Sequence, residues 1–129
     1  MALEVGLQAA LVHEISDDDT AIAMGSGDVP VLATPRLISM AEAACVAALG
    51  DADLAPGVTT VGTRIEFEHL LALPVGDTVL ISSRLVTVDR RALRFEVVAT
   101  DDGDRVIGRG VVDRMLVDRE HFVSRTQNR

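Results

Sequence analysis

The sequence predicts a single α+β domain in which one central helix is wrapped by a curved antiparallel sheet of five or six strands. Three observations lead to this fold class. The chain has 129 residues, one long apolar segment carries helix-start and helix-stop residues, and four extended segments follow it. Because a chain of this length fits one domain with its own core, we assign residues 1–129 to a single domain.

The N-terminal part is expected to form two short strands. Apolar residues alternate with polar or small ones over residues 3–11, which is typical of a strand with one buried face. A second short strand is expected over residues 20–24. The acidic run between them, residues 17–19, has the composition of a turn, and we interpret it as a solvated turn without a function.

Residues 34–49 form the one clear helix. We interpret Thr34 as its N-cap, Pro35 fits the first helical position, and Gly50 supplies the stop. From residue 37 to residue 49 nearly every side chain is apolar, so we expect the helix to be enclosed on nearly every side.

Four extended segments follow, over residues 59–70, 78–89, 92–100 and 105–117. In the first of them one face is expected to carry Val61, Thr63, Ile65, Phe67 and His69. Short polar loops join the last three segments, which favours an antiparallel meander. One sheet around one helix leaves an edge strand exposed, and we expect that edge to pair with a second copy of the chain.

Composition narrows the function classes. The net charge is −8 and only three residues are aromatic, so the chain is poorly suited to nucleic acid. No apolar run reaches the 18 or so residues of a membrane span, and the N-terminus lacks signal-peptide features. With Cys45 as the single cysteine, no internal disulfide forms, and we expect a cytoplasmic protein. The histidines show no ligand spacing, so no metal site is predicted.

Two residues are the main candidates for chemistry. Glu42 lies in the middle of the apolar helix, where an ionised carboxylate is costly unless it is paired. It is either a functional acid or a water-bridged side chain at the helix edge. His69 shares a strand face with apolar residues and is either a satisfied core histidine or an acid–base partner. A meeting of the two, across the helix–sheet interface or across a dimer interface, would favour acid–base work.

Three further residues are open to two interpretations each. The Thr34 hydroxyl either caps the helix or lies beside helix N–H groups that polarise a carbonyl oxygen. Gly62 marks a bulge or a close approach of a ligand. Arg114 is a structural ion-pair partner or holds an anionic ligand.

Five stretches of the sequence together resemble the hotdog-fold thioesterases, and within them the fluoroacetyl-CoA thioesterase-like family. They are Ala-Thr at 33–34, MAEAACV at 40–46, VGT at 61–63, HLLALPVGDTV at 69–79, and IGRG at 107–110 with Arg114. The resemblance extends over residues 3–122. Two departures stand out: the stretch matching the fluoroacetyl-specific member's phenylalanine-bearing lid is shorter here and has no aromatic residue, and Val-Asp-Arg replaces His-Glu-Arg at 112–114.

The resemblance implies a hotdog fold whose two copies join their sheets into one, with the active site at the dimer interface and no cofactor. It places the family's catalytic threonine, glutamate and histidine on Thr34, Glu42 and His69. Its substrate-contacting glycine and arginine fall on Gly62 and Arg114. The implied partners are an acyl-CoA and a second copy, with further pairing into a dimer of dimers left open.

The expected reaction is hydrolysis of a small acyl-CoA to a carboxylate and CoA. Glu42 would either attack the carbonyl and form an anhydride or act as a base towards water, and the sequence leaves both open. One alternative is an acyl-CoA-binding hotdog dimer without catalysis. A hydratase or dehydratase is less well supported, because the Asp-x-x-x-x-His signature is absent around the helix.

Overall fold

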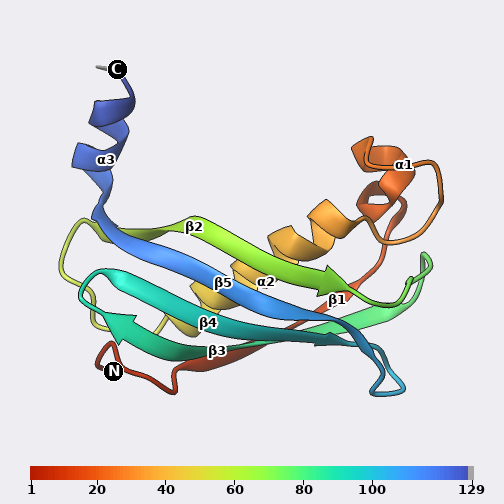
Figure 1. Ribbon diagram of the computed structural model, residues 1–129, viewed down its shortest axis with the longest axis horizontal. Coiled ribbons are helices and arrows are strands. Elements are labelled where there is room, and N and C mark those ends of the chain that lie inside the picture. The colour runs from red at the N-terminus through yellow and green to blue at the C-terminus, as the bar shows by residue number, and fades with distance from the viewer. Residues whose placement is uncertain (128–129) are drawn as a thin grey trace.

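The computed structural model describes residues 1–127 and contains a five-stranded antiparallel sheet with a long helix along one face (Figure 1). The elements in chain order are β1 (Gln8–Glu14), the 3-10 turn η1 (Asp17–Asp19), α1 (Ala21–Met24), α2 (Thr34–Ala48), β2 (Val58–His69), β3 (Thr78–Asp89), β4 (Ala92–Thr100), β5 (Val106–Asp118) and α3 (Arg119–Thr126). The strand order is β1-β3-β4-β5-β2. The predicted meander of the last three strands is confirmed.

The core lies between α2 and the inner face of the sheet. Strand β4 alternates strictly, with Leu93, Phe95 and Val97 buried and the residues between them exposed. Helix α2 contributes Leu37, Met40 and several small side chains to the same layer. Small residues let the helix approach closely, and the Ser83 hydroxyl of β3 donates to the carbonyl oxygen of Ala44 at 2.7 Å.

The single sheet layer leaves the far side of α2 uncovered. Ala43, Val46 and Ala47 are exposed, and Val46 keeps 52% of its surface in contact with solvent. The expectation of near-complete enclosure is therefore wrong for a single chain, because one sheet covers a helix from one side only. An uncovered apolar helix face next to a sheet edge is a surface that a second molecule can cover.

The N-terminal expectations need three corrections. Strand β1 begins at Gln8, because the chain turns at Gly6, whose φ is +104°. The strand expected over residues 20–24 is the helix α1, since the Thr20 hydroxyl accepts a hydrogen bond from the Ala23 N–H at 3.2 Å. Within the acidic run, Asp19 is buried, so the interpretation as a solvated turn is wrong for that residue.

A β-bulge changes the faces of β2. Gly62 pairs with Arg114 and Arg64 pairs with Asp113, which leaves Thr63 as the extra residue. Ile65 and the alternate residues after it face the helix as expected, but before the bulge it is Gly62, and not Val61, that faces α2. The bulge therefore turns a glycine towards the helix.

The C-terminal helix α3 was not predicted. Its N-cap is Asp118, whose carboxylate accepts the His121 N–H at 2.9 Å, and none of its residues is buried. It extends away from the sheet (Figure 1). A helix without an apolar stripe gives no periodic signal. No helix of the described chain is long and apolar enough to cross a membrane.

Candidate active site

Glu42 is paired with a buried arginine. Arg114 Nη1 donates to Glu42 Oε2 at 3.0 Å, the Arg114 side chain is 8% exposed, and the Glu42 side chain is 36% exposed. Thr60 fixes the guanidinium, because Nε donates to the Thr60 hydroxyl at 2.9 Å and Nη2 donates to the Thr60 carbonyl at 3.0 Å. Glu42 is thus a carboxylate that is held in place from the core side and remains open to solvent on the other.

Gly62 lies directly against this carboxylate. A Cβ atom at residue 62 would collide with Oε2 of Glu42 and would come within 3.5 Å of Arg114 Nη1. An alanine at this position would therefore force the Glu42 carboxylate to move from its present place beside Arg114. The bulge at Thr63 and the absent side chain together bring the β2 backbone next to Glu42.

Thr34 and His69 form a second pair. Thr34 Oγ1 and His69 Nδ1 are 2.8 Å apart. The N-cap of α2 is Ala33, so Thr34 is the first helical residue and its predicted role as the N-cap is wrong. Its hydroxyl is therefore free to bond the imidazole. On the other side of the ring, His69 Nε2 is buried and has no hydrogen-bond partner among the described residues. An unsatisfied buried nitrogen of this kind can serve a ligand.

The two pairs lie apart within one chain. Eight residues of helix separate Thr34 from Glu42 by about 12 Å. Seven residues of strand separate Gly62 from His69 by roughly 20 Å. Among the described residues, no hydrogen bond or ion pair joins Glu42 to His69. The structure therefore brings the five predicted residues together as two groups, Thr34 with His69 and Glu42 with Gly62 and Arg114.

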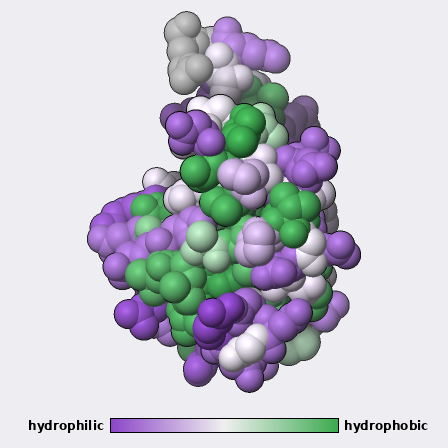
Figure 2. All heavy atoms as spheres, turned by 90° about the vertical axis from the view of Figure 1, so that its right-hand side faces the viewer, coloured by the Kyte–Doolittle hydropathy of each residue, from purple (hydrophilic) through white to green (hydrophobic). Residues whose placement is uncertain are grey.

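A pocket of about 350 Å³ opens beside Thr34 and His69. Its other walls are Ala21, the loop over residues 26–32 and residues 70–72 after β2, and no Phe, Tyr or Trp side chain lines it. Large apolar side chains remain exposed at this end of the molecule, among them Ile22, Val29, Leu70 and Leu71. Figure 2 shows hydrophobic residues gathered on this face with hydrophilic residues around them.

Two features of these surroundings were not found from the sequence. Thr60 was missed, although its place two residues before Gly62 puts both on one face of the strand. The loop over residues 26–32 gave only turn signals. The Cys45 thiol on α2 is buried, and burial, with a smaller contribution from the nearby Glu42 charge, raises its pKa to about 12. No group of three or more potential metal ligands occurs within residues 1–127.

Comparison with known proteins agrees with this architecture. The family described as FlK, fluoroacetyl-CoA-specific thioesterase, matches residues 15–120. The chain belongs to this family. The curated fluoroacetyl-CoA thioesterase of Streptantibioticus cattleyicolor is 34% identical over 99 residues, which cover 77% of this chain and 70% of that protein. The predicted resemblance is thereby confirmed, as is the expectation of a thioester hydrolase.

Solved structures confirm the hotdog fold. A structure of the fluoroacetyl-CoA thioesterase FlK has a TM-score of 0.91 and 28% identity and covers 100% of this chain and 98% of its own. A Thermus thermophilus protein described as a thioesterase superfamily member has a TM-score of 0.87 and 20% identity and covers 97% of this chain and 91% of its own. At 20% identity, that second likeness concerns the fold alone.

Glycine at position 62 gives the first prediction. In Gly62→Ala the new methyl group displaces the Glu42 carboxylate from Arg114, so thioesterase turnover should fall about tenfold or more while the chain still folds. The measurement is kcat beside a thermal unfolding curve. Gly103→Ala is the matched control, because a Cβ there meets only ordinary contact at 3.5 Å. Full turnover in folded Gly62→Ala would contradict the role of this close approach.

Proposed function

We propose that the FlK-family chain hydrolyses a small acyl-CoA thioester to a carboxylate and free CoA, using Thr34, Glu42 and His69. The observation that carries the proposal is a partly exposed carboxylate fixed by a buried arginine, on the same helix as a threonine–histidine pair beside a pocket. Family membership supports the thioesterase reaction, and a relative has been solved in complex with acetyl-CoA.

In this mechanism Glu42 acts on the thioester carbonyl. Arg114 occupies its Oε2 atom, which leaves Oε1 without a hydrogen-bond partner among the described residues. That oxygen either attacks the carbonyl carbon, giving an anhydride that water then opens, or takes a proton from an attacking water. Both routes end with the same carboxylate and CoA. The developing oxyanion would be met by backbone N–H groups at the start of α2 or along the Gly62 stretch.

His69 and Thr34 serve the leaving group. When the Thr34 hydroxyl donates to Nδ1, the ring carries its proton on Nε2, the buried nitrogen without a partner. That proton can be donated to the sulfur as the C–S bond breaks, so that CoA leaves as a thiol. Thr34 fixes the tautomer and the orientation of the ring. The adjoining pocket, whose walls combine apolar side chains such as Leu32 and Leu71 with the polar Ser26 and Asp28, would hold the acyl group of a small substrate.

The complete site would form between two copies of the chain. Strand β2 is an edge strand of the sheet. If two β2 strands pair antiparallel about a two-fold axis at Glu66, the extra residue Thr63 brings position 62 of one chain opposite position 69 of the other. The Glu42 group of one copy then meets the Thr34–His69 pair of the second. The uncovered face of α2 lies where such a partner can cover it.

The reaction is tested by thiol release from a series of short acyl-CoA esters. In Glu42→Gln we expect kcat to fall about a hundredfold or more, because the amide neither attacks nor takes a proton. Glu68→Gln is the control, since that glutamate is exposed on the outer face of β2. Saturable binding of the esters by the native protein without any thiol release would favour the non-catalytic binding dimer.

The assay itself carries a prediction about Cys45. Because burial raises the pKa of this thiol to about 12, the native chain should give no signal with a disulfide thiol reagent at neutral pH. One equivalent should appear only after unfolding in denaturant. Rapid labelling of the native chain would show that α2 opens readily from the core.

Mixing two inactive variants tests the shared site. Thr34→Ala and Glu42→Ala chains are unfolded together and refolded as a mixture. If each site takes Thr34 from one copy and Glu42 from the other, half of the dimers are mixed and each has one intact site, so about a quarter of native activity should return. If both residues act from one chain, the mixture stays inactive. Each variant refolded alone is the control.

A further inference from the structure

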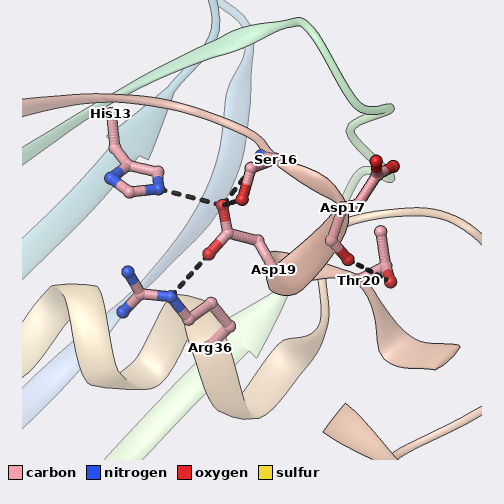
Figure 3. A network of polar contacts seen from close by, with 6 residues as sticks. All are labelled: His13, Ser16, Asp17, Asp19, Thr20 and Arg36. Carbon is pink, nitrogen blue, oxygen red and sulfur yellow. Dashed lines mark hydrogen bonds and ion pairs between the residues drawn. The ribbon is translucent and has the colours of Figure 1, made fainter. Parts of the chain in front are cut away.

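The buried carboxylate of Asp19 ties together three elements near the N-terminus of α2 (Figure 3). Its side chain is 5% exposed. One oxygen, Oδ2, accepts from the Ser16 N–H at 2.8 Å and the Ser16 hydroxyl at 3.1 Å, and lies 2.9 Å from His13 Nε2. The other, Oδ1, accepts from Arg36 Nε at 2.8 Å. Strand β1, the residue before η1 and the first turn of α2 thus all contact the Asp19 carboxylate.

Asp19 holds the chain on both sides of Thr34. Its backbone oxygen accepts the Ala33 N–H at 2.9 Å, one residue before Thr34. Its side chain accepts from Arg36, two residues after Thr34. The direction of the Thr34 hydroxyl, and with it the 2.8 Å contact to His69, therefore depends on where Asp19 sits.

The same residue supports the wall of the pocket. Thr20, which follows Asp19, pairs with Leu32 in a β-bridge, and the Ala21 N–H donates to the Val31 carbonyl at 2.9 Å. Ala21, Val31 and Leu32 all line the pocket beside Thr34. A shift of Asp19 would therefore move the pocket wall together with the start of the helix.

Helix α2 needs this support because its own sequence provides little. The N-cap is Ala33, which has no side chain able to cap, and the first turn contains no acidic residue. The only hydroxyl at the helix start, that of Thr34, is bonded to His69. The Asp19 carboxylate lies outside the helix and is bonded to Arg36. It fixes the start of α2 in the way that a capping side chain normally does.

We propose that Asp19 is a positioning residue for the Thr34–His69 pair, fixing the start of α2 and the adjoining pocket wall for the reaction. The inference rests on the proposed function, in which that pair acts on the leaving group. Asp19 itself touches neither Thr34 nor His69 through its side chain, so its effect passes through Ala33, Arg36 and the wall of the pocket.

The charge of Asp19 persists across the pH range of an assay. Burial alone raises the pKa of the carboxyl group, but the hydrogen bonds from the Ser16 backbone, Arg36 and His13 outweigh it and hold the pKa well below its ordinary value of 3.8. A carboxyl group whose pKa is lowered by folding stabilises the fold at pH values above its ordinary pKa. This stabilisation is lost as the pH falls below that ordinary pKa. Asp19→Asn therefore removes a charge at every pH from about 5 to 9.

The test compares Asp19→Asn with Asp101→Asn. Asp101 is a matched carboxylate, 7% exposed, that accepts from the Gly103 and Arg105 N–H groups and from Arg105 Nε at the β4–β5 turn. We expect kcat for thiol release to fall about tenfold or more in Asp19→Asn, with KM changed less than about threefold. Asp101→Asn should keep kcat within about twofold, although it also loses thermal stability.

A second readout reports on the pair directly. The imidazole NMR chemical shifts of His69 should change in Asp19→Asn and stay unchanged in Asp101→Asn. Hydrogen exchange of the Ala33 N–H should become faster in Asp19→Asn alone. If Asp19→Asn does not fold, Arg36→Gln removes one bond of the same cluster and should lower kcat in the same way.

Each outcome decides the inference. A folded Asp19→Asn chain with kcat within about threefold of the native value and unchanged His69 imidazole NMR signals overturns it, and Asp19 is then only part of the fold. If the native chain releases no thiol, the proposed function fails, and the His69 imidazole NMR signals and the Ala33 hydrogen exchange alone decide whether Asp19 positions the pair.

Discussion

The ion pair between Glu42 and Arg114 is the contact on which the arrangement of the site depends. A carboxylate on a helix this apolar needs a partner, and the partner comes from the inner face of β5, buried to 8% exposure. Burying the guanidinium is itself costly, and Thr60 offsets that cost by accepting two of its N–H bonds. The pair therefore sets three constraints at once: a glycine at position 62, a bulge at Thr63 and a fixed distance between α2 and β2.

The two halves of the site follow from the geometry of one helix against one strand. The rise per residue in a helix is less than half that in a strand. A helix residue and a strand residue that touch at one point are therefore followed, the same number of residues further on, by residues that lie far apart. Thr34 meets His69 near one end of β2, and Glu42 meets Gly62 nearer the other. Antiparallel pairing of β2 with a second copy reverses the strand and so brings unlike ends together. The proposed shared site uses this geometry, because it would join the Thr34–His69 pair of one copy to the Glu42 group of the other along the β2 edge.

The local sequence pattern predicted most of the helices and strands. It failed where contacts between segments distant in the sequence determine the local structure. Strand β4 has a strict alternation and the helix α2 has clear end signals around a continuous apolar segment, so both were predicted within a residue of their observed bounds. The bulge in β2 was placed only as one option at Gly62, because a bulge is defined by its partner strand. Asp19 was read as a solvated turn, since nothing in the run of three aspartates distinguishes the one that meets His13 and Arg36. Likewise Arg114 and Thr34 were both predicted as site residues, but their pairing with Glu42 and His69 was not, because the partners lie 72 and 35 residues apart in the sequence.

Charges supplied from outside α2 leave its own polar atoms free for other contacts. At its start, Asp19 binds Arg36 and the Ala33 N–H, so the Thr34 hydroxyl is not consumed as a cap and can bond His69. In its middle, Arg114 neutralises one oxygen of Glu42, so that a carboxylate persists on an apolar helix with its second oxygen still open. A helix with its own cap and its own ion pairs would be more stable alone, and it would offer a ligand fewer unsatisfied groups. The polar groups that this helix presents are available because strands and turns carry the stabilising contacts in its place.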